Sequence, residues 1–95
     1  MMNKKALKMN ENDNVATLVS DAKAGDIVEA VSEFGNIEIR VKAKDLIPFG
    51  HKVSLTNIQK NGNIVKYGKV IGVSSRPIEK GEHVHIHNVK SQAVG

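Results

Sequence analysis

The sequence is divided into short apolar runs by chain reversals that recur from residue 13 onward. Four segments share one plan, in which an apolar or small residue, two or three linking residues and a glycine precede a new apolar run. They read AKAGDIV (22–28), IPFGHKV (47–53), IQKNGNIV (58–65) and IEKGEHV (78–84). Glycine tolerates the positive φ of tight turns, so we expect Gly25, Gly50, Gly62 and Gly81 to adopt it. Such frequent reversals exclude a long helical bundle.

The runs between these reversals are rich in Val and Ile. Short β-branched runs that are interrupted every roughly eight to twelve residues are typical of an all-β domain. No segment sustains the apolar i, i+3, i+4, i+7 pattern of a long helix, and residues 43–46 are the best candidate for a helical turn. The Asn61-Gly62 pair is the commonest hairpin dipeptide. The sequence therefore predicts a mainly β fold of short strands, with at most a helical turn or two.

A chain of 95 residues forms one small domain. We expect a flexible polar leader at residues 1–12, the folded domain at 13–89, and a tail or linker at 90–95. The chain has two Phe, one Tyr and no Trp, so the core must be aliphatic. Because such a core buries little area per residue, self-association or docking onto a partner would help to stabilise the domain.

The charge and the composition exclude several classes of function. The net charge is +4, but the lysines are scattered and aromatic residues are few, which argues against a nucleic-acid partner. The absence of cysteine excludes disulfides, thiolate chemistry and Cys-based zinc sites. No run approaches the roughly 18 apolar residues of a membrane span, so we expect a soluble, cytoplasmic protein without a membrane partner.

Three of the four histidines fall in one segment, KGEHVHIHNV, at the alternate positions His83, His85 and His87. Side chains alternate between the two sides of a strand. We therefore expect the three imidazoles on one outer face, with Val84 and Ile86 turned toward the core. The row is either plain polar surface or a functional site, and its biased use of histidine favours the functional interpretation.

A metal site is the natural functional interpretation, because neutral imidazole is the commonest metal ligand. Same-face neighbours on a strand lie about 6.5 to 7 Å apart and the outer two of three about 13 Å apart. One ion can therefore bridge two of these rings but hardly three. Further ligands must come from a loop, such as Gly50-His51, or from another polypeptide.

Two other segments carry polar side chains next to a glycine. In GHKV, His51 and Lys52 follow Gly50, and in VKYGK, Lys66 and Tyr67 precede Gly68. An ammonium group and a phenol can bind a carboxylate and a hydroxyl of a substrate, or take part in proton transfer. Composition alone favours the simpler interpretation, in which Lys66 faces solvent and Tyr67 is a surface aromatic.

Four segments in this order and spacing resemble the SAF-type small domain of the altronate and galactarate dehydratase family, which is also the small subunit of sulfolactate sulfo-lyase. They are DNVATLV (13–19), IPFGHKVSL (47–55), IVKYGKVIG (64–72) and IEKGEHVHIHNV (78–89). The resemblance covers residues 13–89, and the combination of GHK, KYG and HVHxHN is specific to it. It implies a β-clip fold, a compact arrangement of short bent strands.

The resemblance also implies a function. Members of this family are lyases that eliminate water, or sulfite from sulfolactate, and they need a divalent metal, Fe²⁺ or Mn²⁺. The small domain is joined to, or paired with, a larger one that carries most of the active site. We therefore expect this chain to be a small subunit or a domain of such an enzyme, inactive alone, with a sugar acid or another hydroxy acid as substrate.

In that setting we expect His85 and His87 to lie nearest to the metal or substrate, with His83 as a possible further ligand. The candidate catalytic residues are His51, Lys52, Lys66 and Tyr67. Asn88, Gly50 and Gly68 are candidates for substrate contact or for a structural role, and Asn88 is expected to anchor a turn. The alternative function is a non-catalytic SAF module that binds a carbohydrate or a partner protein.

Overall fold

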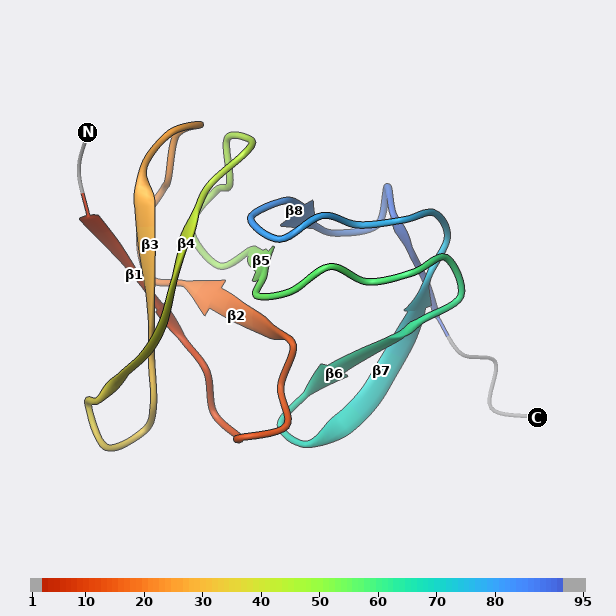
Figure 1. Ribbon diagram of the computed structural model, residues 1–95, viewed down its shortest axis with the longest axis horizontal. Helices are drawn as coiled ribbons and strands as arrows, with labels where there is room; N and C mark the ends of the chain where they lie inside the picture. The colour runs from red at the N-terminus through yellow and green to blue at the C-terminus, as the bar shows by residue number, and fades with distance from the viewer. Residues whose placement is uncertain (1–2, 92–95) are drawn as a thin grey trace.

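A computed structural model describes residues 3–91 of the chain (Figure 1). The described residues form strands and no helix, so the predicted all-β class is confirmed. The strands are β1 (Asn3–Leu7), β2 (Val15–Leu18), β3 (Ile27–Val31), β4 (Ile37–Lys42), β5 (Lys52–Ser54), β6 (Asn63–Lys66), β7 (Lys69–Ser74), β8 (His83–Val84) and β9 (Val89–Lys90). Within residues 3–91 there is consequently no helix that is long and apolar enough to cross a membrane.

The strands form two sheets. The larger sheet has the order β4-β3-β1-β2-β5-β8, and the smaller has the order β6-β7-β9. Neighbouring strands are antiparallel except for β1 and β3, which are parallel. Figure 1 shows the hairpin of β6 and β7 beside the larger sheet, whose strands β5 and β8 lie in the middle of the view.

The core consists of two clusters of small and aliphatic side chains, one within the larger sheet and one between the two sheets. Leu18, Ile47 and Val53 belong to the first cluster, and Ile64 and Val84 to the second. The aromatic residues lie outside both clusters, with exposed fractions of 82% for Phe34, 67% for Phe49 and 58% for Tyr67. The expected aliphatic core is therefore confirmed.

The four repeated segments form turns of the same kind, and these turns are joined in two pairs. The first and second segments are joined by a bridge between Ala22 and Ile47, and the third and fourth by a bridge between Ile58 and Ile78. Each bridge has two backbone hydrogen bonds of 2.7–2.8 Å. The apolar residue that opens each segment therefore holds two turns together, which accounts for the repeat.

The prediction of a positive φ is wrong for one of the four glycines, Gly62. Gly25, Gly50 and Gly81 have φ values of +96°, +83° and +92°, as expected, but in the third segment Asn61 takes this position with φ +67°. Asn is the residue besides Gly that most readily adopts a left-handed conformation. Gly62 is the next residue, and its N–H closes the turn on Gln59 O at 2.8 Å. The Asn61-Gly62 pair thus leads into β6 and does not connect two strands of a hairpin.

Two other expectations about local structure are wrong. Residues 43–46 form a bend between β4 and the next turn, without a helical turn. Residues 3–7 are not a flexible leader, because β1 lies between β2 and β3 and its Ala6 is fully buried. At the other end, Lys90 belongs to β9, and residues 92–95 of the expected tail lie outside the described residues.

Candidate metal and substrate site

The candidate site is built where β5 and β8 pair at one edge of the larger sheet. The register places Lys52 opposite Val84 and Val53 opposite His83. Directly opposed residues share a face, so Val53 and His83 lie on one side and Lys52 and Val84 on the other. His51 directly precedes β5 and, by the alternation of side chains along a strand, shares the side of His83.

The HVHIHN segment is not one extended strand, which corrects the expected row of three histidines. Only His83 and Val84 form β8, and residues 85–88 turn back toward β9. Val84 is buried as predicted, but Ile86 is 85% exposed and does not face the core. The alternation therefore ends after two residues, and His85 and His87 take their positions from the turn.

Asn88 holds this turn in place, the structural role expected for it. Its side chain is fully buried, its Oδ1 accepts a hydrogen bond from the N–H of His85 at 3.0 Å, and its Nδ2 donates one to the carbonyl of His83 at 2.9 Å. Because both bonds are to the backbone of histidines, Asn88 orients the segment that carries them. The alternation of His with Val and Ile in the sequence does not show that this turn begins directly after Val84.

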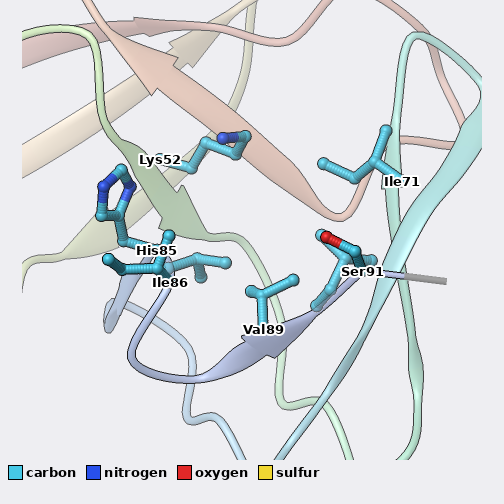
Figure 2. A pocket seen from close by; sticks show the side chains of 8 residues that line it. Lys52, Ile71, His85, Ile86, Val89 and Ser91 are labelled. Atoms are coloured by element: carbon cyan, nitrogen blue, oxygen red, sulfur yellow. The ribbon is translucent and has the colours of Figure 1, made fainter. Parts of the chain in front are cut away.

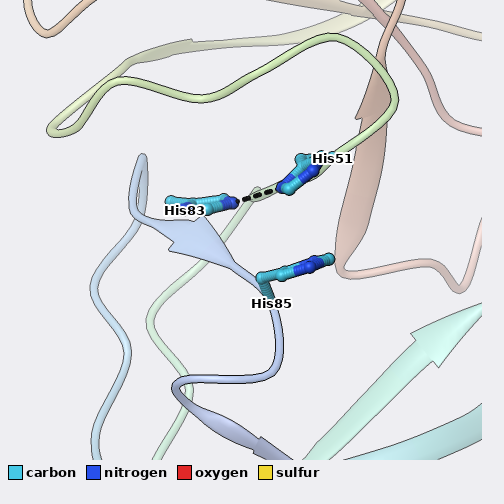
Figure 3. Close-up of side chains that lie close together, drawn as sticks. All are labelled: His51, His83 and His85. Atoms are coloured by element: carbon cyan, nitrogen blue, oxygen red, sulfur yellow. Dashed lines mark hydrogen bonds between the residues drawn. The ribbon is translucent and has the colours of Figure 1, made fainter.

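His51, His83 and His85 converge on one point (Figure 3). One ring nitrogen from each lies within 4.8 Å of the others. His51 Nδ1 is 2.8 Å from His83 Nε2, and the His51 ring stacks on that of His85 with centroids 4.0 Å apart. We call these three residues the histidine cluster. All are half-buried, so the nitrogens are sheltered but reachable from solvent.

His87 lies next to this cluster rather than within it. Its ring centroid is 5.0 Å from that of His83, and its side chain is exposed. The loop histidine His51, which the sequence indicated as a source of extra ligands and as a candidate catalytic residue, lies in the centre of the group. His51 is brought there because β5 and β8, which follow the turns of the second and fourth segments, pair with each other. This pairing joins distant parts of the chain, so no local sequence pattern predicts it.

The environment of His83 and His85 favours neutral imidazoles. Burial lowers the pKa of His83 to about 4, with smaller contributions from His87, His51 and His85, and the Asp45 carboxylate opposes this shift. Burial, followed by the charges of His51, Lys52 and His87, also lowers the pKa of His85. Both rings are consequently neutral near pH 7, the form in which imidazole binds a metal.

Lys52 lies on the other face of β5, beside a groove with a volume of about 170 Å³ that also contacts His85 (Figure 2). Apolar side chains form most of this groove, among them Ile71, Ile86 and Val89. Burial, followed by the charge of Lys66, lowers the pKa of Lys52. A cationic group with its usual solvation reduced, next to imidazoles, is suited to bind a carboxylate or to transfer a proton.

Tyr67 and Gly68 form the turn of the β6–β7 hairpin, where both have positive φ, +55° and +71°. Gly68 N–H donates to Asp13 Oδ1 at 2.8 Å. In Figure 1 this turn is at the lower end of the hairpin, whereas β8 is near the top. Lys66 Nζ lies 5.1 Å from the centroid of the Tyr67 ring. Within this chain the KYG segment therefore builds a turn, and Tyr67 is not brought to the histidine cluster.

Gly50 also has a structural place. Its φ is +83°, and its N–H donates to Leu18 O at 2.9 Å, which ties the turn before β5 to β2. Of the sequence-predicted site residues, the structure thus unites His51, His83, His85 and Lys52. Asn88 and Gly50 support them, and His87 lies at the edge.

Comparisons with known proteins bear on what this arrangement does. Residues 4–92 match the family model described as the altronate/galactarate dehydratase SAF domain. The chain is 38% identical to the altronate dehydratase of Bacillus subtilis, over 93% of this chain and 16% of that protein. It is 32% identical to subunit alpha of the (2R)-sulfolactate sulfo-lyase of Chromohalobacter salexigens, over 79% of this chain and 80% of that subunit.

A third relative, the galactarate dehydratase (L-threo-forming) of Escherichia coli, is 37% identical over 82% of this chain and 14% of its own length. The chain therefore spans most of the sulfo-lyase subunit but only a small part of the dehydratases. The dehydratases are larger proteins that carry this domain, whereas in the sulfo-lyase it is a subunit of its own.

Proposed function

Because this chain belongs to the altronate/galactarate dehydratase SAF domain family, we propose that it is the small subunit, or one domain, of a hydroxy-acid lyase. The relatives are named for altronate, galactarate and sulfolactate, which are all hydroxy acids. The proposed reaction is the elimination of water or, from sulfolactate, of sulfite. A larger polypeptide would complete the active site, as the lengths of the dehydratases and the subunit name of the sulfo-lyase suggest.

The observation that carries this proposal is the convergence of His51, His83 and His85. The cluster fits a divalent metal, because its nitrogens lie close enough to share one ion and the lowered pKa values of His83 and His85 keep these two rings neutral. Imidazole suits iron better than manganese, since affinity for nitrogen ligands rises from Mn²⁺ to Fe²⁺. Three ligands from one chain leave further positions for substrate and for the larger polypeptide, as in catalytic metal sites.

When bound, the metal would supply the positive charge that stabilises the substrate after its α-proton has been removed. The residues of this chain would act around that charge. His51, His83 and His85 would hold the metal, and Lys52 would bind a carboxylate of the substrate through its ammonium group. Removal of the proton α to the carboxylate and protonation of the leaving hydroxide would use groups of the larger polypeptide, on the far side of the site.

A metal titration of the purified chain tests this assignment. Co²⁺ serves as the probe, since its visible spectrum reports imidazole ligation, and calorimetry then gives the affinities for Fe²⁺ and Mn²⁺. Alanine substitution of His51, His83 or His85 should each weaken binding at least tenfold. The matched control is His87→Ala, which removes a neighbouring imidazole and should leave the affinity within about twofold, within the scatter expected for an exposed side chain.

A loss of affinity in His87→Ala equal to that in His51→Ala would refute the cluster as the metal site. The lyase assignment has a separate test, in which the chain replaces subunit alpha in the Chromohalobacter salexigens sulfo-lyase and sulfite release is measured. Release by the remaining subunits alone, equal to that of the mixture, would overturn the subunit assignment. It would leave the alternative of a carbohydrate- or partner-binding module.

A further inference from the structure

Large apolar side chains are unusually exposed around the histidine cluster. Among the described residues, four exceed 60% exposure: Phe34 at 82%, Leu46 at 62%, Phe49 at 67% and Ile86 at 85%. Three of the four lie beside the cluster. Phe49 is two residues before His51, and Ile86 follows His85. Leu46 follows Asp45, whose Oδ2 accepts a hydrogen bond from the N–H of His83 at 3.1 Å.

Hydrogen bonds of the backbone fix the turns that carry two of these side chains. The Phe49 N–H donates to Asp21 Oδ1 at 2.7 Å. The turn of Ile86 is anchored by the buried Asn88 at both His83 and His85. Apolar side chains held outward by well-bonded turns stay in contact with water in the isolated domain. Large exposed apolar side chains that gather in one region mark interaction surfaces.

The groove beside Lys52 extends this apolar region. Ile86 lines the groove together with Ile71 and Val89, and His85 lies at one end of it (Figure 2). Ile71, on β7, is 41% exposed. Leu46 and Phe49 are thus close to the cluster along the chain, and Ile86 and Ile71 share the groove that His85 lines. We call these four apolar residues together the apolar rim.

We propose that the apolar rim is the surface on which the larger polypeptide of the lyase docks. This inference rests on the proposed function and adds the location of the contact. In the Bacillus subtilis relative, the matched segment is only 16% of the chain, so a much larger body accompanies a domain of this kind. Within residues 3–91 the cluster offers only three imidazoles, and docking at its border would bring the missing ligands from outside.

The energetics and the charge agree with this occupant. A stable interface buries about 800 Å² on each partner, from roughly 20 to 30 residues, with an apolar centre and a polar border. The apolar rim supplies such an apolar centre, and the polar residues of the surrounding turns supply the border. A second copy of this chain is a poorer occupant, since each copy has a net charge of +4 and like charges would oppose the contact.

The test measures binding of the 95-residue chain to the Chromohalobacter salexigens sulfo-lyase from which subunit alpha has been removed. Phe49→Ser and Ile86→Ser should each raise the dissociation constant at least about tenfold, as for apolar residues at the centre of an interface. Both should keep the melting temperature and the Co²⁺ affinity of the unaltered chain. The matched control is Phe34→Ser, an aromatic in the β3–β4 turn that is 82% exposed, which should bind like the unaltered chain.

The outcomes separate the two proposals. If the unaltered chain binds and the Phe49 and Ile86 variants bind equally well, or if Phe34→Ser weakens binding as much, the docking face is refuted and the lyase function stands. If the unaltered chain does not bind at all, the proposed function fails together with the docking face. Sedimentation of the chain alone provides a further check, because a dimer that Ile86→Ser dissociates would make a second copy the occupant.

Discussion

Asn88 decides how the histidines are arranged. A strand would have spaced His83 and His85 about 6.5 to 7 Å apart. The turn that Asn88 anchors directly after Val84 instead brings the ring of His85 onto that of His51. The sequence correctly indicated an inward Val84, and a site at the histidines stays a prediction. It could not indicate where the strand ends, because the alternation of His with Val and Ile continues to Ile86 although the strand stops at Val84.

Asn88→Ala should therefore damage both stability and metal binding. Two partly buried backbone groups would lose their partner, at a cost of up to about 1–3 kcal/mol for each unsatisfied group. With the turn released, His85 would no longer be held beside His51, and we expect the Co²⁺ affinity of the folded protein to fall at least tenfold. Urea denaturation and a Co²⁺ titration measure the two effects.

Asn14 provides the matched control, since its side chain makes the same two kinds of bond elsewhere. Its Nδ2 donates to Asn63 O and its Oδ1 accepts from Val65 N–H, both at 2.8 Å. Asn14→Ala should lower the free energy of unfolding to a comparable degree and leave the Co²⁺ affinity unchanged. Equal loss of metal affinity in both variants would mean that Asn88 acts only through general stability.

At the scale of the elements, the turn segment is the unit from which the fold is built. In each copy the residue with positive φ donates its N–H to a residue of another segment: Gly25 to Ala43, Gly50 to Leu18, Asn61 to Ser74 and Gly81 to Ser54. The turns therefore join elements as well as reverse the chain. The repeat was visible in the sequence, because glycine and the opening apolar residue mark each copy. The pairing of the copies was not, because it depends on contacts between distant segments.

Glycine can be required in these turns for two reasons, a positive φ and a lack of space for a Cβ. Gly25 and Gly81 allow these two reasons to be separated. Their φ values are nearly equal, +96° and +92°. A Cβ on Gly25 would meet nothing within 4 Å, whereas one on Gly81 would lie 2.1 Å from the carbonyl oxygen of Lys42. Gly25→Ala should cost only the conformational strain, about 1–2 kcal/mol. Gly81→Ala should cost considerably more, since the backbone of β4 must also move.

Thermal denaturation of the two variants measures this difference. For a domain of this size, each kcal/mol lowers the melting temperature by about 4–8 °C. We expect a moderate decrease for Gly25→Ala and a decrease at least twice as large, or failure to fold, for Gly81→Ala. Equal decreases would show that the close approach of Gly81 to Lys42 contributes nothing and that backbone conformation alone selects glycine.

For the whole molecule, the position of β1 is decisive. Although it is the first described strand, it lies inside the larger sheet, parallel to β3 and antiparallel to β2. Its sequence is polar and rich in Lys, which predicts a flexible leader, and in the structure only Ala6 of this strand is buried. Contacts with distant segments make it a strand. Its backbone pairs with β2 and β3, and the Lys5 ammonium group forms an ion pair with Glu29 on β3 at 3.1 Å.

The effect of removing this strand follows from its place in the sheet. Deletion of residues 1–7 would leave β2 and β3 with unpaired inner edges and expose the first core cluster, so we expect the loss of cooperative unfolding in a thermal scan.

Ala6→Asp, which places a charge at a fully buried position, should lower the melting temperature by more than 10 °C, since an unpaired buried charge costs several kcal/mol. Leu7→Asp is the matched control at a 43% exposed position and should change it little. If the deletion left the melting temperature unchanged, residues 3–7 would be a leader after all, and the domain would begin at β2.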